Sequence, residues 1–166
     1  MTSFHRGDWL AVVQAITATF AVVAAFAVVF VQNWLERRRQ RLDAIRLMRF
    51  AYSYVESAHA HAEMFESMIK KEANESAIDF RRMKLVMTQL LREMNSVPTL
   101  NLPTVLSARI FGMAKDQTER LIELIESESK GRTAASYITF PSLVRTLREV
   151  RDQLHAENVR VRKGGR

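Results

Sequence analysis

No charged side chain occurs in the twenty-four residues between Trp9 and Trp34, and this run constrains the chain more than any other feature. A helix of that length rises about 36 Å, which exceeds the ~30 Å thickness of the hydrocarbon core of a bilayer. The two tryptophans bracket the run, as aromatic side chains do at the two interfaces of a membrane. The sequence therefore predicts a transmembrane helix over residues 9–34.

Two other interpretations of this run fit less well. A cleaved signal peptide has a basic start and an apolar stretch of about 7 to 15 residues. Here the start is nearly neutral, the run is longer, and a cluster of arginines follows it: Arg37, Arg38, Arg39 and Arg41. The core helix of a soluble protein would need apolar partners, and no other segment of the sequence is apolar enough to enclose this one.

Basic residues are distributed unequally on the two sides of the span. Residues 36–49 contain six arginines against two acids, whereas residues 1–8 contain Arg6 and Asp8. Because cytoplasmic flanks carry the excess of basic residues, we expect an extracytoplasmic stub over residues 1–8 and a cytoplasmic location for everything after Trp34. The four arginines after Trp34 form a collar that suits anionic lipid head groups, although control of topology alone would also explain them.

The net charge of +7 raises nucleic acid as a partner. The excess, however, lies in the arginine-rich flank and in residues 159–166, which hold four bases and no acid. Residues 50–158 contain fourteen basic and fifteen acidic residues and are close to neutral. This distribution favours the lipid bilayer, with its anionic head groups, over nucleic acid as a partner. Residues 159–166 are expected to form a basic disordered tail.

Small and polar residues of the span fall on one narrow stripe when positions are placed at intervals of 100°. Small residues let helix backbones approach closely, and a glutamine in lipid gains from bonding to a neighbouring helix. We interpret the stripe as a helix-pairing face and expect a homo-oligomer, although an alanine-rich span also shows such a stripe by chance. The pairing residues are Gln14, Ala18, Ala21 and Ala25.

Residues 35–158 are predicted to form a helical cytoplasmic domain. Apolar residues recur at steps of three and four over residues 42–69, 78–94, 104–129 and 143–154. The predicted seam of the first of these helices is Leu42, Ile45, Met48, Tyr52, Val55, Ala62, Phe65 and Ile69. The predicted face of the third is Leu106, Ile110, Met113, Leu121 and Ile125. The last is expected to carry Leu143, Val144, Leu147, Val150 and Leu154.

The predicted boundaries rest on a few local signals. Asn74 to Ser76 breaks the first helix, and Ser76 followed by Asp79 resembles a cap of the second. The prolines of "SVPTLNLP" make residues 96–103 a connector, and Gly131 suits a helix end. Pro141 suits the first turn of the last helix, while residues 133–140 are ambiguous between helix and a short extended piece.

The expected fold is all-α. One N-terminal transmembrane helix continues into an antiparallel bundle of about four helices. The long first helix also has a pattern that permits pairing with copies of itself as a coiled coil.

Motifs for catalysis are absent from the sequence. The five glycines form no phosphate-binding loop, there is no cysteine, and nothing resembles a nucleophile elbow or a zinc-protease helix. In "ESAHAHAE", Glu56, His59 and Glu63 share a helix face, and a Glu-x-x-His step is a ligand unit of di-iron bundles. Those bundles need a second such step, which this chain lacks. We therefore expect His59 to be a hydrogen-bonded seam histidine, with no metal, no cofactor and no enzymatic activity.

The opening "DWLAVVQAITATFAVVAAFAVVFVQNWLERRRQRLDAI" resembles the start of small uncharacterised bacterial inner-membrane proteins that have one span, an arginine collar and a helical cytoplasmic part. The resemblance covers about the first quarter of the chain and implies only localisation in the bacterial inner membrane. We expect a noncatalytic, self-associating anchor, scaffold or interaction module with an unidentified protein partner. Two alternatives stay open: a membrane-acting defence or toxin effector, and a phage inner-membrane spanin of reversed topology.

Overall fold

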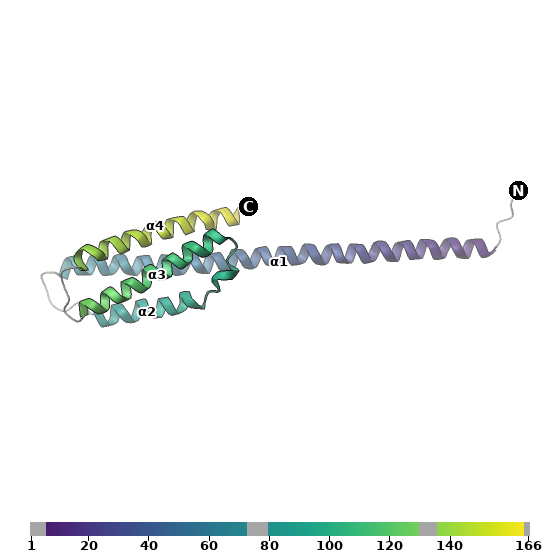
Figure 1. Ribbon diagram of the computed structural model, residues 1–166. Helices are drawn as coiled ribbons and strands as arrows, with labels where there is room; N and C mark the ends of the chain where they lie inside the picture. Colours follow the sequence, from purple (N-terminus) through teal and green to yellow (C-terminus); the bar gives the residue numbers. More distant parts are fainter. Residues whose placement is uncertain (1–5, 73–79, 130–135, 165–166) are drawn as a thin grey trace. The chain divides into compact units, whose positions relative to one another are not determined.

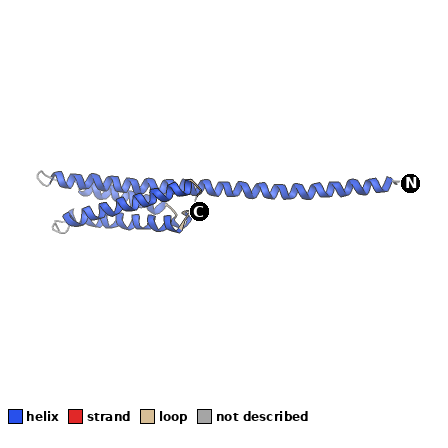
Figure 2. Cartoon of the chain, turned by 90° about the horizontal axis from the view of Figure 1, so that it is seen from above, coloured by secondary structure: helices blue, strands red, loops and turns tan. Residues whose placement is uncertain are grey.

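The computed structural model describes residues 6–72, 80–129 and 136–164. In chain order its elements are α1 (Arg6–Glu72), α2 (Phe80–Ser96), the short 3-10 turn η1 (Thr99–Asn101), α3 (Val105–Ser129) and α4 (Ser136–Arg162) (Figure 1). The described residues contain no strand (Figure 2). The all-α fold with four long helices is confirmed.

Two compact units make up the chain, and the division between them falls within α1. The first unit is Met1–Leu42 and the second is Asp43–Arg166. In the first unit, every described side chain from Trp9 onward is exposed. In the second unit, the remainder of α1 packs with α2, α3 and α4, and successive helices run in opposite directions (Figures 1 and 2). This unit is the antiparallel bundle that the sequence predicts.

The part of α1 inside the bundle buries a regular seam. Its buried apolar residues follow alternating steps of three and four, the spacing that keeps one face of a helix against its neighbours. They are Met48, Ala51, Val55, Ala58, Ala62 and Phe65. Tyr52, which the sequence placed in the seam, is only half-buried, whereas Ala51 and Ala58 are completely buried in it. Small alanines there allow close approach of the partner helices.

The connector between α2 and α3 lies where its prolines predict. Thr104 precedes α3 and caps it: the Ser107 backbone N–H donates to Thr104 Oγ1 at 3.0 Å, and the Thr104 N–H donates to Ser107 Oγ at 3.2 Å. This reciprocal pair satisfies two backbone donors that a helix start would otherwise leave without partners. The predicted start of α3 is confirmed to within one residue.

The predicted buried face of α3 is partly wrong. Leu106 and Met113 are exposed, whereas Ser107 and Thr118 are buried. The hydroxyl of Ser107 is satisfied by Thr104, and the Thr118 hydroxyl donates to the backbone oxygen of Ala114 at 2.8 Å. Because their hydroxyls bond locally, these small polar residues enter the core without an unsatisfied group.

Helix α4 extends beyond the predicted limits at both ends. It begins at Ser136 rather than in a turn started by Pro141, and it includes residues 136–140, which excludes the extended alternative there. Phe140 is buried in the core, so the apolar face continues upstream of the proline. At the other end α4 runs to Arg162, and Val161 packs against the core, so the predicted disordered tail is wrong for Val159–Arg162.

The five core residues predicted for α4 are all buried: Leu143, Val144, Leu147, Val150 and Leu154. The break at Asn74 to Ser76, the cap by Ser76 and Asp79, and the stop at Gly131 lie outside the described residues. The bundle core has two clusters. One, around Met48, includes Leu102 and Leu154, and the other, around Phe65, includes Met87 and Leu147.

Candidate functional site

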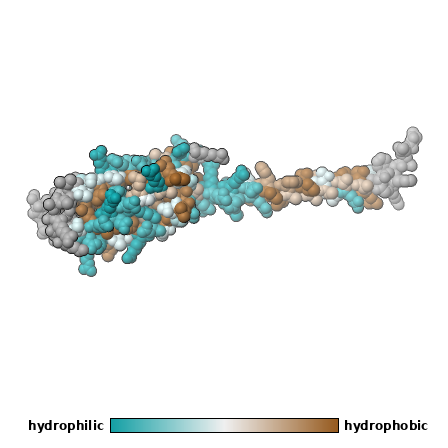
Figure 3. Space-filling view, in the orientation of Figure 1, coloured by the Kyte–Doolittle hydropathy of each residue, from teal (hydrophilic) through white to brown (hydrophobic). Residues whose placement is uncertain are grey.

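The apolar stretch of α1 is long and apolar enough to cross a membrane. Its large side chains point into the surroundings of the helix; the Phe26 side chain, for example, is 73% exposed. In Figure 3 this stretch is mostly brown, the colour of hydrophobic residues. A continuous exposed apolar surface of this size is unfavourable in water and marks a membrane or protein contact.

Two threonine side chains within the stretch bond to their own helix. The Thr17 hydroxyl donates to the Val13 backbone oxygen, and the Thr19 hydroxyl donates to that of Ala15, both at 2.8 Å. A polar group in lipid must find its hydrogen-bond partner within the protein. These two bonds meet that requirement for both threonine hydroxyls without water or a second chain.

The four predicted pairing residues are all exposed, as are their neighbours on the helix. They are Gln14, Ala18, Ala21 and Ala25. Their exposure in a single chain is therefore no different from that of the opposite helix face, and pairing through these residues stays a prediction.

Trp34 and the arginine collar are adjacent on α1. Trp9 and Trp34 are both exposed, and the Arg38 guanidinium carbon lies 5.5 Å from the centre of the Trp34 ring. A guanidinium above an indole face is a favourable cation–π contact. The other collar residues, Arg37, Arg39 and Arg41, are exposed as well. The predicted interfacial residues thus leave both the aromatic ring and the charges accessible to lipid head groups.

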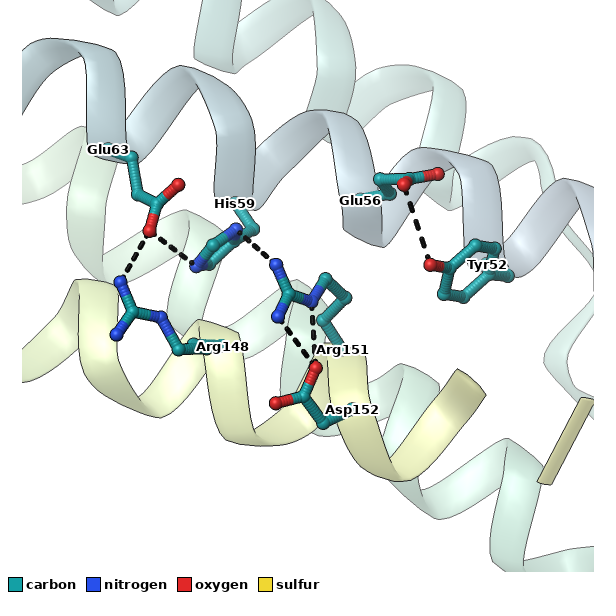
Figure 4. A network of polar contacts seen from close by, with 7 residues as sticks. All are labelled: Tyr52, Glu56, His59, Glu63, Arg148, Arg151 and Asp152. Atoms are coloured by element: carbon teal, nitrogen blue, oxygen red, sulfur yellow. Dashed lines mark hydrogen bonds and ion pairs between the residues drawn. The ribbon is translucent and has the colours of Figure 1, made fainter. Parts of the chain in front are cut away.

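A polar network joins α1 to α4 inside the bundle (Figure 4). His59, only 2% exposed, stands at its centre, with its Nδ1 atom 3.1 Å from a terminal nitrogen of Arg151. Because a guanidinium only donates, Nδ1 accepts, and the proton of a neutral imidazole therefore lies on Nε2. Nε2 faces a Glu63 carboxylate oxygen at 3.4 Å, close enough for electrostatic attraction but without hydrogen-bond geometry.

The acids and arginines around His59 pair with one another. Glu63 accepts a hydrogen bond from Arg148 of α4, and Arg151 donates two hydrogen bonds to Asp152 at 2.7 and 2.9 Å. Glu56 is not part of this group, because it accepts from the Tyr52 hydroxyl at 3.5 Å (Figure 4). The network therefore alternates positive and negative groups along the α1–α4 contact.

Burial and charge set the protonation of the network. Burial lowers the pKa of His59 below 6.5, Arg151 and Arg148 lower it further, and Glu63 only partly opposes them. The hydrogen bond from Arg148 lowers the pKa of Glu63, with the nearby His59 and Arg151 adding to the effect against a smaller effect of burial. At neutral pH this gives a neutral imidazole beside a charged carboxylate.

These contacts give the three predicted metal candidates, Glu56, His59 and Glu63, separate protein partners. Arginines approach the atoms of His59 and Glu63 that would have to face a cation, and Glu56 is engaged by Tyr52. Within the described residues no three His, Cys, Asp or Glu side chains are grouped as metal ligands. His61 lies on another face, where its ring stacks on that of Phe65 with centroids 6.1 Å apart. The arrangement is that of a structural contact between helices.

Sequence reasoning missed Arg148 and Arg151. They lie 85 and 92 residues from their partners on α1, and their only local signal is that they flank the buried Leu147 and Val150. That position marks them as residues at the edge of a helix contact, but it does not identify the partner.

A second polar contact ties the α2–α3 connector to the end of α4. Thr104 Oγ1 donates to Glu157 Oε1 at 2.7 Å, and Arg160 lies 3.7 Å from the other oxygen of the same carboxylate. Glu157 is buried, so its charge is compensated by these two groups rather than by water.

Comparison of the chain with protein-family models, with curated proteins and with solved structures found no match.

Proposed function

We propose that the protein is a single-pass anchor of the bacterial inner membrane that presents a helical bundle to the cytoplasm as a noncatalytic interaction module. The observation that carries this proposal is the change within α1. Before Leu42 its apolar side chains are exposed on all sides, whereas after Asp43 one face of the helix is a buried apolar seam. A helix with that division suits lipid in its first part and protein in its second.

The charges next to the apolar stretch support the orientation. The collar residues are exposed directly after Trp34, whereas the N-terminal side of the stretch has a single arginine and a single aspartate. Translocating four adjacent arginines is unfavourable, so the bundle side is the cytoplasmic side.

The polar groups of the bundle support an interaction role. The charged side chains near His59 and at Glu157 pair across helix contacts and hold the bundle together. A bundle held together in this way and tethered to a membrane anchor presents its exposed surface to a protein partner near the bilayer. Pairing of spans through Gln14, Ala18, Ala21 and Ala25 would place several copies of this surface side by side and raise avidity.

Reporter fusions to the C-terminus of the full chain test this function. A cytoplasmic bundle predicts fluorescence of a fused green fluorescent protein and no activity of a fused alkaline phosphatase. Alkaline phosphatase activity without fluorescence would contradict the proposal and would favour the spanin-like topology instead.

A matched variant shows whether the collar sets the orientation. Replacing Arg37, Arg38, Arg39 and Arg41 by glutamine is expected to yield a mixture of both reporter signals. The same number of exposed arginines replaced within the bundle should leave the original pattern. An unchanged pattern in the collar variant would remove the collar as the determinant of topology.

A further inference from the structure

Two apolar side chains at one end of the bundle are almost completely exposed. Leu100 in η1 is 97% exposed, and Val105 at the start of α3 is 88% exposed. Next to Val105, Leu106 is 47% exposed. Among the large hydrophobic side chains described in the bundle, one other is more than 60% exposed: Leu85 on α2, at 68%. Exposure of this degree is therefore concentrated in the α2–α3 connector and the first residue of α3.

The connector holds these side chains outward through fixed contacts. Within η1 the backbone N–H of Asn101 donates to the oxygen of Pro98 at 3.0 Å, and that of Leu102 donates to the oxygen of Thr99 at 3.2 Å. Val97 and Leu102 are buried in the core on either side of Leu100. Since the flanking residues are anchored, Leu100 cannot turn inward without breaking this packing.

Basic side chains outnumber acidic ones next to the exposed apolar residues. No acidic residue occurs between Glu93 and Asp116, and the exposed Arg109 lies in this segment one turn after Val105. The end of α4 lies against the connector through the contact of Thr104 with Glu157, and beyond it Arg162 and Lys163 are exposed. Apolar side chains beside exposed bases are the combination that binds the interface of anionic membranes.

The same end of the bundle is where α1 enters it. Met48 shares a core cluster with Val97 and Leu102 of the connector, and Val161 packs on that cluster. Only nine positions separate Trp34, the end of the apolar stretch, from Asp43, the first residue of the bundle unit. Nine residues of helix rise about 14 Å.

We propose that this surface, formed by Leu100, Val105 and Leu106 with Arg162 and Lys163, docks on the anionic lipid head groups of the membrane that α1 spans. This docking surface rests on the proposed membrane anchor. Anionic lipid fits it better than a second copy of the chain, because two copies meeting through the same basic surface would repel each other. Docking would hold this end of the bundle at the bilayer and leave its other end accessible to a partner.

The test uses single cysteines, which the chain permits because it has none of its own. The full-length variants Leu100→Cys, Leu85→Cys and Val23→Cys are labelled with a bimane fluorophore and placed in nanodiscs containing one quarter phosphatidylglycerol in phosphatidylcholine. Quenching by lipids with a doxyl group near the head group or in the acyl chain reports lipid contact, and iodide reports exposure to water. Leu85→Cys is the matched control, since it is an exposed leucine near the other core cluster of the bundle.

Docking predicts that the label at position 100 loses more than about half of its fluorescence to lipid quenchers, while the label at position 85 is quenched mainly by iodide. The double variant Arg162→Glu with Lys163→Glu should lower the ratio of docked to undocked bundle by about 25-fold or more, since each base near an anionic surface contributes about fivefold. Arg81→Glu with Arg120→Glu makes the same change of charge away from the surface and should have little effect. Circular dichroism confirms that each variant is folded.

Three outcomes separate the possible failures. Equal iodide quenching at positions 100 and 85, with lipid quenching at position 23, would overturn docking and leave the anchor intact. Protection of position 100 from iodide without lipid quenching would also overturn it, because another protein chain would then cover the surface. Absence of lipid quenching at position 23 would contradict the membrane anchor itself, and docking with it.

Discussion

The two parts of α1, before Leu42 and after Asp43, differ in how their apolar side chains are exposed. The first part exposes phenylalanine, valine and leucine on every side of the helix. The second part buries a seam of apolar residues with alternating steps of three and four and leaves a few others, such as Phe50, exposed. The seam is narrow because the rest of that helix surface faces water, whereas a helix in lipid needs no polar face. This division suits the membrane anchor that we propose, with lipid around the first part and a bundle in water around the second, and it falls just after the densest group of arginines.

The largest expected effect is the loss of folding stability when a phenylalanine in one of the two units is replaced by alanine. Phe111→Ala should lower the free energy of unfolding of the bundle by about 3–5 kcal/mol, because it removes a fully buried ring and leaves a cavity. Phe26→Ala, in the exposed apolar stretch, should leave bundle stability unchanged. Chemical unfolding of the full chain in detergent micelles, followed by circular dichroism, measures both. An equal loss for Phe26→Ala would show that the stretch packs in the bundle.

A charge near the middle of the span should affect membrane insertion alone. Val22→Arg is expected to disfavour insertion by about 2.5–3.5 kcal/mol, whereas Phe50→Arg, at an exposed position of the bundle part of α1, should have no effect. The fraction of the chain that resists carbonate extraction from cell membranes reports insertion. Full retention of Val22→Arg together with loss of Phe50→Arg would reverse the assignment of the two parts.

Acid should weaken the bundle through His59. Its folded-state pKa is below 6.5, so the unfolded chain binds more protons there, and the free energy of unfolding falls as pH drops below about 6.5. The slope for this one group is at most about 1.4 kcal/mol per pH unit. Glu63, whose pKa is also lowered, adds a further loss as pH falls below its ordinary value of 4.5.

The variant His59→Gln isolates the histidine contribution. A glutamine carries no charge at any pH, so the decline between pH 7 and pH 5 should become smaller in unfolding measurements on the full chain. An identical pH profile for the variant and the original protein would show that His59 does not supply the effect.

The smallest expected effects concern pairing of the span. Ala21→Ile should separate two helices that meet on the small-residue face, while Val23→Leu on the opposite face should do little. Gln14→Leu should only weaken pairing, because interhelical polar bonds in membranes average about 0.6 kcal/mol. A membrane two-hybrid assay compares the three variants. Equal signals for Ala21→Ile and Val23→Leu would leave the span a plain anchor.

Periodicity in the sequence predicted the elements of the bundle well where apolar residues alone define the face. The α4 core from Leu143 to Leu154 is the clearest case, since large aliphatic residues recur there and Thr146, the small polar residue in this range, is not among the buried ones. In α3 the same reasoning chose Leu106 and Met113, because it gave no weight to Ser107 and Thr118. Those hydroxyls bond to nearby atoms of their own helix start or backbone, which makes them equivalent to small apolar residues.

The polar network was harder to predict than the fold. The sequence identified His59 as a seam residue, but its contact with Arg151 depends on how far α4 is shifted along α1, which local pattern does not determine. The proposed docking surface likewise had no signal in the sequence, because Leu100 and Val105 resemble core residues. Their exposure becomes evident only in the structure, where the neighbouring Val97 and Leu102 are the buried ones.

The most direct test of two environments along one helix is a spin-label scan of α1 in the full chain, reconstituted in nanodiscs. Residues 12–31 are predicted to show higher accessibility to oxygen than to a water-soluble nickel complex at every position, as expected in lipid. Residues 45–69 are predicted to show low accessibility to both reagents at the seam, as at Ala51, Val55 and Ala58, and high accessibility to nickel between them. Nickel accessibility across residues 12–31 equal to that of the exposed bundle positions would contradict the account.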